Sequence, residues 1–258
     1  MAIGLSRSAD ATLETLEIYD LDNGGPLPLR LPERYRVLYT VPPSRTADTD
    51  VRLERLLAQL EPAPVAFVYV STTGVYGDRG GAAVDENAEP APATQRSQRR
   101  VAAETLLEAW CGERGVRLVI LRVPGIYGPG RLGIERVRAG MPVIREADAN
   151  PGNRIHIDDL VSCCRAALER ESAAGVFNVG DGDTRSSTWF VKEVARQCQL
   201  AEPPEISRDE AARVFSSQRL SFLSEARRID TRRMREVLGV EPRFASAEDG
   251  IRASLAQE

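Results

Sequence analysis

The sequence from Ala66 to Gly77 reads AFVYVSTTGVYG, an apolar run that ends in small hydroxyl residues and a glycine turn. A continuous apolar run is typical of a strand that is buried on both faces of a parallel sheet. In open α/β sheets, ligands bind beyond the carboxyl ends of such strands. The run therefore predicts a central parallel strand over 65–70, with a ligand site directly after it.

Strand and helix signals alternate on both sides of this run. Short apolar runs predict strands, and apolar residues at helical spacing predict helices. The predicted strands are 1–5, 16–19, 36–41, 65–70, 117–123 and 176–179, and the predicted helices are 53–60, 99–114, 158–169, 188–199 and 230–238. Such alternation indicates an α/β fold with a doubly wound parallel sheet and right-handed crossovers.

Three segments, in this order, resemble the extended short-chain dehydrogenase/reductases, the NAD-dependent epimerase/dehydratase family. Residues 71–77 resemble the Ser-Thr/Ser-x-x-Val-Tyr-Gly signature that ends the family's fifth strand. Residues 118–130, LVILRVPGIYGPG, resemble the sixth strand and the loop that lines the nicotinamide and substrate pockets. Residues 154–160, RIHIDDL, resemble the element that opens the next helix.

The resemblance implies a Rossmann-like core that binds NAD(P) over residues 1–130. Residues 131–258 are then expected to complete the core at about 154–180 and to form a small C-terminal substrate lobe. The implied activity is that of an NAD(P)-dependent reductase or epimerase/dehydratase acting on a small or nucleotide-linked substrate. The competing hypothesis is a catalytically inactive member that binds a nucleotide or a partner protein.

Matching the family's motifs also implies site residues. Arg7, at the end of the strand that resembles the family's second one, has no acid beside it and favours NADP, since an arginine accepts the 2′-phosphate. The implied cofactor-binding residues are Ser6, Arg7, Asp20, Thr72, Arg100, Pro124, Gly125 and Ile126. The implied substrate-binding residues are Arg96, Arg131 and Arg154.

Arginines stand where the family has its catalytic Tyr-x-x-x-Lys. Counting back from Glu104, which matches a glutamate of the family, the two positions are Arg96 and Arg100. A guanidinium stays protonated up to about pH 12, so it cannot exchange a proton as the tyrosine does. Arg100 is expected to hold the cofactor ribose or a phosphate, and Arg96 an anionic substrate group. A solvated helix surface is the alternative for both.

Three other residues are candidates for catalysis. Thr72 aligns with the family's hydroxyl that hydrogen-bonds the substrate oxygen. Tyr76 and Tyr127 are the nearest candidate proton donors, and packing is the alternative for each. His156, close to Asp158 and Asp159, suggests a Ser-His-Asp hydrolase, but no G-x-S-x-G elbow accompanies it. We therefore interpret His156 as structural, with Asp158 or Asp159 capping a helix.

A glycine-rich turn is missing from the first 60 residues. In this class, backbone N–H groups of such a turn and a helix amino terminus bind the pyrophosphate. The resemblance thus begins at the family's second strand, and the family's first strand and first helix have no counterpart in this sequence. Three explanations stay open: a first unit upstream of Met1, loss of cofactor binding, or an altered first unit in which 1–5 is the first strand and Ser8 caps a substitute helix. Binding of NADP or NAD is therefore undecided at this stage.

The composition of the chain narrows the classes of protein to which it can belong and the partners that it can have. The chain has 258 residues, 42% of them hydrophobic, and a formal net charge of −4, which suffices for one sizeable core. The sequence shows no basic tract and no apolar run of about 20 residues, so we expect neither nucleic acid nor a membrane as partner. It shows no signal-peptide pattern, so we expect a cytoplasmic protein, and its substrate is expected to be a small molecule. Its four cysteines lack C-x-x-C spacing and it has one histidine, so reduced cysteines and no metal site are expected. These features leave the oligomeric state unknown.

Overall fold

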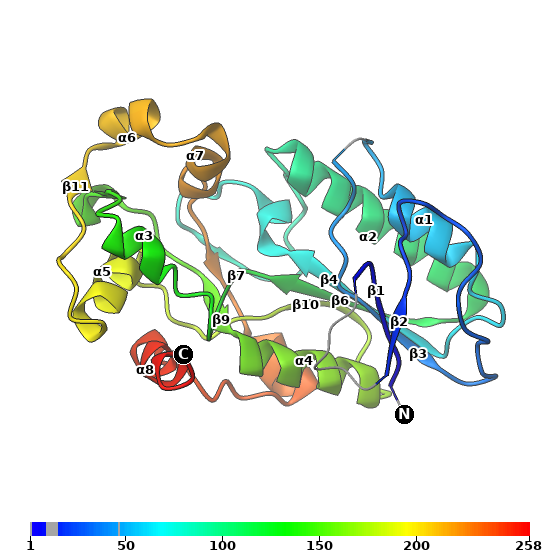
Figure 1. Cartoon of the computed structure of the whole chain (residues 1–258). Coiled ribbons are helices and arrows are strands. Elements are labelled where there is room, and N and C mark those ends of the chain that lie inside the picture. The colour runs from blue at the N-terminus through cyan, green and yellow to red at the C-terminus, as the bar shows by residue number, and fades with distance from the viewer. Residues whose placement is uncertain (1, 9–14, 46) are drawn as a thin grey trace.

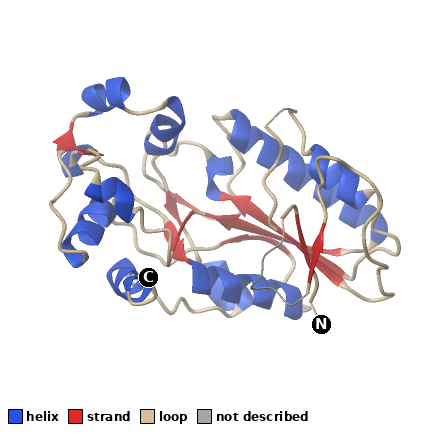
Figure 2. Cartoon of the chain, in the orientation of Figure 1, coloured by secondary structure: helices blue, strands red, loops and turns tan. Residues whose placement is uncertain are grey.

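A computed structural model of the chain describes residues 2–8, 15–45 and 47–258, and a four-stranded parallel sheet lies at its centre (Figures 1 and 2). The strand order is β10 (Gly175–Asn178), β6 (Arg117–Val123), β4 (Ala66–Thr72) and β3 (Arg36–Tyr39). Consecutive strands of this sheet are neighbours, so the chain advances across it in one direction. Helices cover both faces, which confirms the predicted Rossmann-like α/β class.

Alternation along the strands explains the two helical layers. Phe67 and Tyr69 of β4 pack with α1 (Val51–Leu57) and α2 (Gln95–Arg114) on one face. Val68, between them, packs with α4 (Ile157–Glu169) on the other face. Successive side chains of a strand point to opposite faces, so a strand covered on both sides needs apolar residues at every position. The continuous run in β4 meets that requirement.

The observed elements follow the predicted ones with small differences. β3 ends at Tyr39, before Pro42 and Pro43, which lack the N–H that a ladder requires. The helix predicted over 99–114 begins earlier, after the Thr94 side chain caps it by accepting from the Ser97 N–H. The helix predicted over 230–238 is a π-helical turn over Met234–Leu238.

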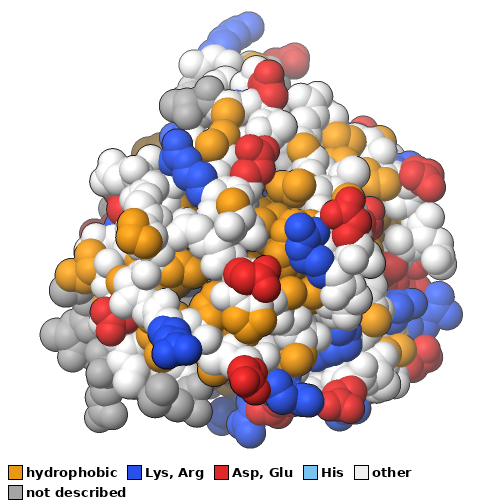
Figure 3. Space-filling view, turned by 90° about the vertical axis from the view of Figure 1, so that its right-hand side faces the viewer, with side chains coloured by type: hydrophobic (Ala, Val, Ile, Leu, Met, Phe, Trp, Pro, Cys, Tyr) orange, Lys and Arg blue, Asp and Glu red, His pale blue; other side chains and the backbone are white. Residues whose placement is uncertain are grey.

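The first two strands lie apart from this sheet. β1 (Gly4–Ser6) and β2 (Leu16–Ile18) form a separate parallel pair. Within the described residues, the outer edge of β3 has no strand partner. The alternative in which residues 1–5 replace the family's first strand in the sheet is therefore wrong for the described part of that segment. Figure 3 views the end of the molecule on the right of Figure 1, where hydrophobic side chains reach the surface. Ile3, Leu5, Ile18 and Leu38, in or beside β1, β2 and β3, are exposed.

Of the helices after residue 130, α4 packs on a face of the sheet, whereas α3, α5, α6, α7 and α8 gather beyond the carboxyl ends of the sheet strands, and we call these five helices the C-terminal lobe (Figure 1). They span Ile134–Arg138, Ser187–Gln197, Arg208–Val214, Ser217–Leu223 and Ala247–Leu255. Three short parallel pairs complete the fold: β5 (Ala83–Val84) with β12 (Arg228–Ile229), β7 (Gly125–Tyr127) with β9 (Arg154–His156), and β8 (Val143–Ile144) with β11 (Glu205–Ile206). The division into residues 1–130 and 131–258 stays a prediction.

Two further expectations concern the whole chain. All four cysteines are free thiols, and Cys111, Cys163 and Cys164 are buried among apolar side chains. In the described part of the chain, no helix is both long and apolar enough to cross a bilayer.

Candidate functional site

The carboxyl ends of β4 and β6 lie side by side and bring several predicted site residues together. Thr72, the last residue of β4, pairs with Val123, the last residue of β6. Pro124, Gly125 and Ile126 follow at once, so they begin next to Thr72. The Oγ1 atom of Thr72 accepts a hydrogen bond of 3.2 Å from the Gly74 N–H, and the side chain is half-buried. Its own hydroxyl proton is left to donate outward.

The turn after β4 depends on glycine. Residues 73–76 form the short 3-10 helix η1, and Gly77 follows it with a φ of 66°. A Cβ atom at Gly77 would collide with the carbonyl oxygen of Ala91. The left-handed φ and the close approach of the backbone both require glycine here, so the last residue of the opening motif shapes the loop beside Thr72.

Arg100 is anchored at the same strand end. Its Nη1 donates to the carbonyl oxygen of Val70 at 2.8 Å and to the hydroxyl of Tyr69 at 3.0 Å. Burial raises the pKa of Tyr69 to about 12, and the adjacent Arg100 opposes that rise. Tyr69 is therefore a neutral hydrogen-bond partner at ordinary pH, and Arg100 presents its charge near Thr72.

Arg96 lies one turn earlier on α2 and contacts the C-terminal lobe. Its guanidinium carbon is 3.9 Å from the ring centroid of Phe222 in α7. Burial lowers the pKa of Arg96, Glu225 opposes that change, and the positive charges of Arg100 and Arg227 lower the pKa further. The guanidinium makes no hydrogen bond or ion pair with any described residue.

A buried ion pair holds α2 in register with the sheet. Arg122 Nη2 of β6 is 2.7 Å from Glu104 Oε2 of α2, and the two side chains are 6% and 5% exposed. The Ser71 hydroxyl of β4 also donates to Glu104. These contacts fix the helix that carries Arg96 and Arg100. The pair could have been suspected from an acid on the apolar side of a helix and an arginine within an apolar strand, but sequence reasoning used Glu104 only as a marker.

Both candidate tyrosine donors lie in the interior. The Tyr76 hydroxyl donates to Asn178 Oδ1 at 2.7 Å, and the guanidinium of Arg122 lies 4.7 Å from its ring centroid. The Tyr127 hydroxyl packs against Gly250, and burial raises the pKa of Tyr127. Contacts of this kind are typical of tyrosines that pack in the protein interior. A role as proton donor stays a prediction for each.

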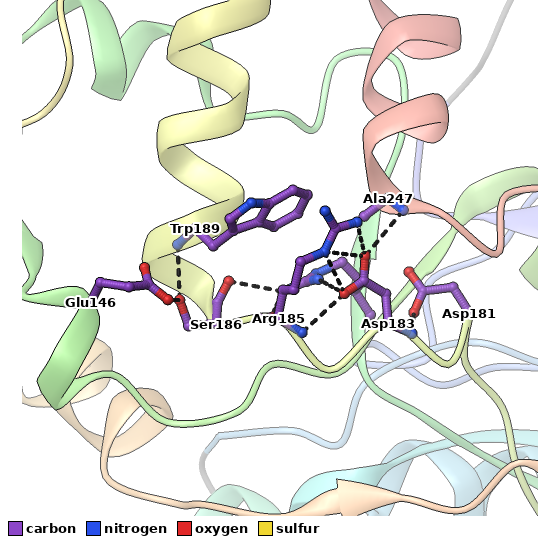
Figure 4. Close-up of polar contacts among 8 residues, drawn as sticks. Glu146, Asp181, Asp183, Arg185, Ser186, Trp189 and Ala247 are labelled. Carbon is purple, nitrogen blue, oxygen red and sulfur yellow. Dashed lines mark hydrogen bonds and ion pairs between the residues drawn. The ribbon is translucent and has the colours of Figure 1, made fainter.

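Arg154 is also interior and joins the sheet to the C-terminal lobe (Figure 4 shows its surroundings). Its Nη2 donates to the carbonyl oxygens of Ser186, at 3.1 Å, and of Arg185, and its Nη1 is 3.4 Å from Asp183 Oδ1. The Asp183 carboxylate also accepts from the Ala247 N–H that begins α8. Because Nη2 is bound to two carbonyl oxygens and the charge is paired with Asp183, these contacts of Arg154 are structural, and its predicted role in substrate binding is untested.

Asp181 lies next to this network with one oxygen unpaired. Its Oδ1 accepts from the Asp183 N–H at 2.8 Å, whereas its Oδ2 has no hydrogen-bond partner among the described residues. The residue is 2% exposed. Burial raises the pKa of Asp181 to about 7, although Arg154 opposes the rise. Sequence reasoning missed this residue, because nothing local distinguishes it from a loop aspartate.

His156 has the structural role predicted for it, but the predicted helix cap is wrong. Its Nδ1 accepts from the Asp158 N–H at 3.2 Å, so the imidazole itself caps α4. Nε2 is then the protonated nitrogen, and it donates to Ser254 Oγ of α8 at 3.2 Å. Asp159 instead accepts from the backbone N–H groups of Arg243 and Phe244, because a distant segment of chain packs over its side of the helix.

The predicted residues near the N-terminus lie on the separate β1–β2 pair. Arg7 Nη1 is 3.6 Å from Asp22 Oδ2, and Asp20 accepts from the Asp22 N–H and the Asn23 side chain within its own turn. Ser6 ends β1. In residues 2–8 and 15–45, no glycine-rich turn leads into a helix. The described residues therefore lack the turn and helix amino terminus that usually hold a dinucleotide pyrophosphate. Arg131 is exposed in the turn after β7.

Known proteins share this arrangement. The family model for the NAD dependent epimerase/dehydratase family matches residues 39–180. The dTDP-glucose 4,6-dehydratase of Streptomyces niveus is 27% identical over 194 residues, covering 72% of this chain and 54% of the relative. The 3-diazoavenalumate denitrifying reductase of a Streptomyces species is 28% identical over 232 residues, covering 84% and 75%. The chain thus spans about half the length of the dehydratase.

Solved structures agree at the level of the fold. A functionally unknown conserved protein from Silicibacter pomeroyi DSS superposes with a TM-score of 0.82 at 27% identity, covering 99% of this chain and 89% of that one. MoeE5 in complex with UDP-glucose and NAD gives 0.76 at 20% identity, covering 98% and 89%. The family match extends over more than half of the chain and includes both strand ends that carry the candidate site. The protein belongs to the NAD-dependent epimerase/dehydratase family.

Proposed function

We propose that this protein is an NAD(P)-dependent reductase or epimerase/dehydratase-like enzyme for a small or nucleotide-linked substrate. The observation that carries the proposal is the meeting of Thr72, Arg100 and Pro124 at the adjoining ends of β4 and β6. In this family the nicotinamide and the reacting part of the substrate meet at these strand ends. The names of the dehydratase and reductase relatives support the same class of chemistry.

The roles that follow are specific. Arg100, held by the Val70 carbonyl oxygen, would bind a ribose hydroxyl or a phosphate in place of the family's lysine. Thr72 would donate its hydroxyl proton to a substrate oxygen. Pro124 to Ile126 would line the nicotinamide ring. NADP is the favoured cofactor because Arg7 is the cation that follows β1; a 2′-phosphate bound there would replace the Asp22 carboxylate, which lies 3.6 Å from Arg7 Nη1.

A non-catalytic protein that binds a nucleotide or a partner at the same strand ends is the second candidate. Two observations favour it: arginines occupy both dyad positions, and the hydroxyls of Tyr76 and Tyr127 are buried in packing contacts. Neither arginine can replace a phenol as an acid. This candidate predicts ligand binding without turnover.

Titration calorimetry with NADPH and NADH, extended to millimolar concentrations, tests the proposal. A measurable affinity, followed by turnover at roughly one per second, would support the enzyme. A reductase would consume NADPH absorbance with a carbonyl substrate, whereas an epimerase or dehydratase returns the hydride to its substrate, so its nucleotide-sugar product would be detected by chromatography. Thr72→Val should then reduce turnover, whereas Thr72→Ser should retain most of it. Binding without turnover favours the second candidate, and no binding of either dinucleotide would overturn the proposed function.

A further inference from the structure

We propose that Arg96, Arg100 and Arg227 form an oxyanion site that selects substrates carrying a carboxylate or phosphate next to the reacting carbon. We call these three residues the arginine site. The inference deepens the proposed function and rests on it for the position of the reacting carbon. It concerns the substrate group that the site recognises, which is separate from cofactor binding.

Segments far apart in the sequence assemble this site. Arg96 and Arg100 occupy the first two turns of α2, and Arg227 follows α7. Arg227 Nη1 donates to the carbonyl oxygen of Gly77 at 2.7 Å, in the turn directly after Thr72 and η1. Arg96 stacks on Phe222 of α7, which lies beside the start of α2 (Figure 1). Arg100 at the Val70 carbonyl oxygen and Arg227 at the Gly77 carbonyl oxygen thus lie before and after Thr72 along the chain, and both act electrostatically on Arg96.

The charges around the arginine site are unevenly paired. Glu225 is 2.6 Å from Arg227 Nη1, and Asp78 also acts on Arg227 as an opposite charge. Arg100 is hydrogen-bonded to a carbonyl and a phenol oxygen, and the buried Asp50 acts on it as an opposite charge. Arg96 makes no hydrogen bond or ion pair with any described residue; Glu225 acts on it as an opposite charge, and Arg100 and Arg227 act on it as like charges. An added anion at this place would therefore pair first with Arg96.

The contacts of Arg96 argue against a freely solvated side chain. Its guanidinium carbon lies over the Phe222 ring, 3.9 Å from the ring centroid, and burial is the largest influence on its pKa. Stacking of this kind fixes the guanidinium plane while leaving its edge N–H groups free to donate. Two parallel N–H donors match the two oxygens of a carboxylate or phosphate. Arg99, in the same helix, instead donates its Nε N–H to the Ala47 carbonyl oxygen.

The position of Arg96 determines which group of a substrate its charge can bind. Arg96 occupies the place of the tyrosine that acts on the reacting carbon in the family, so an anion bound there lies beside that carbon and within the neighbourhood of Thr72. The guanidinium remains charged at any ordinary pH and contributes orientation, not a proton. A uronic acid or a phosphorylated compound fits such a site, whereas a neutral hexose leaves its cations unpaired.

A matched pair of ligands tests the inference: UDP-glucuronic acid and UDP-glucose differ by a carboxylate in place of a hydroxymethyl group. Calorimetry at one salt concentration should show that the chain binds the acid about tenfold more tightly or better, the value of one charged hydrogen bond. Arg96→Leu keeps an apolar contact with Phe222 and should abolish the preference, while Arg96→Lys should retain part of it. Arg165→Leu, an exposed arginine of α4 paired with Glu169, removes the same charge elsewhere and should leave the preference intact.

Inorganic phosphate provides a probe that needs no nucleotide. It should raise the melting temperature of the unmodified chain and not that of Arg96→Leu, which must itself melt cooperatively. If phosphate raises the melting temperature only when Arg96 is present and neither nucleotide sugar binds, the arginine site is supported and the proposal of a nucleotide-linked substrate is wrong. Equal affinity for both nucleotide sugars, a preference that survives in Arg96→Leu, or a phosphate effect that is identical in the two proteins would overturn the inference.

Discussion

Replacing Asp181 by asparagine should stabilise the protein in mildly alkaline solution and have little effect in acid. The Asp181 carboxyl is 2% exposed, and burial raises its pKa from the ordinary 3.8 to about 7. The folded state therefore holds this proton more tightly than the unfolded state does. Stability falls as the pH rises from about 4 to about 7, and the penalty is complete above that range.

The size of the effect follows from the two pKa values. The difference between 3.8 and about 7, at about 1.4 kcal/mol for each pKa unit, is worth about 4 kcal/mol as an upper bound. Asparagine resembles the protonated acid in shape and keeps an oxygen for the Asp183 N–H. It therefore avoids the cost of burying the charge, and an increase of about 2 to 4 kcal/mol in the free energy of unfolding is expected at about pH 8.

Urea unfolding of both proteins at about pH 5 and about pH 8 measures the difference. Burial lowers the pKa of His156, which destabilises the fold in acid, but this contribution is common to both proteins and cancels in the subtraction. Asp183→Asn is the matched control. Burial raises the pKa of Asp183, but hydrogen bonds from Arg185 outweigh that and lower it, so this variant should be less stable at about pH 8. A stability difference for Asp181→Asn that is independent of pH would refute the reasoning.

Three other outcomes are expected. Arg122→Met leaves the Glu104 carboxylate buried and unpaired, so urea unfolding should show a loss of about 3 to 5 kcal/mol; a loss below about 1 kcal/mol would contradict the buried pair. Calorimetry should show that the 258-residue chain binds NADPH with a dissociation constant well above micromolar and in preference to NADH, and that Arg7→Ala loses the preference; equal affinities in the unmodified chain would remove Arg7 from the site. Tyr76→Phe removes the hydrogen bond to Asn178, so it should lower the melting temperature and leave any turnover nearly unchanged. A large loss of turnover in a variant that still folds stably would identify Tyr76 as the proton donor.

Local patterns determined the family and the order of the elements. The continuous apolar run of β4 can be satisfied only by a strand covered on both faces, and Gly77 marks the turn that follows it. The prediction that Arg96 and Arg100 stand at the positions of the family's catalytic pair likewise comes from the sequence, and the residue types alone exclude proton transfer by those two side chains.

The tertiary structure decided what surrounds each of these charges. The sequence predicts Arg154 to bind substrate, yet the loop that holds Asp183, Arg185 and Ser186 encloses it. Asp181 begins the same loop and owes its raised pKa to burial. The arginine site needs Phe222 and Arg227, which reach the start of α2 only through the returning C-terminal chain. Apolar periodicity and turn chemistry depend on neighbours in the sequence, whereas burial and charge balance depend on segments that only folding brings together.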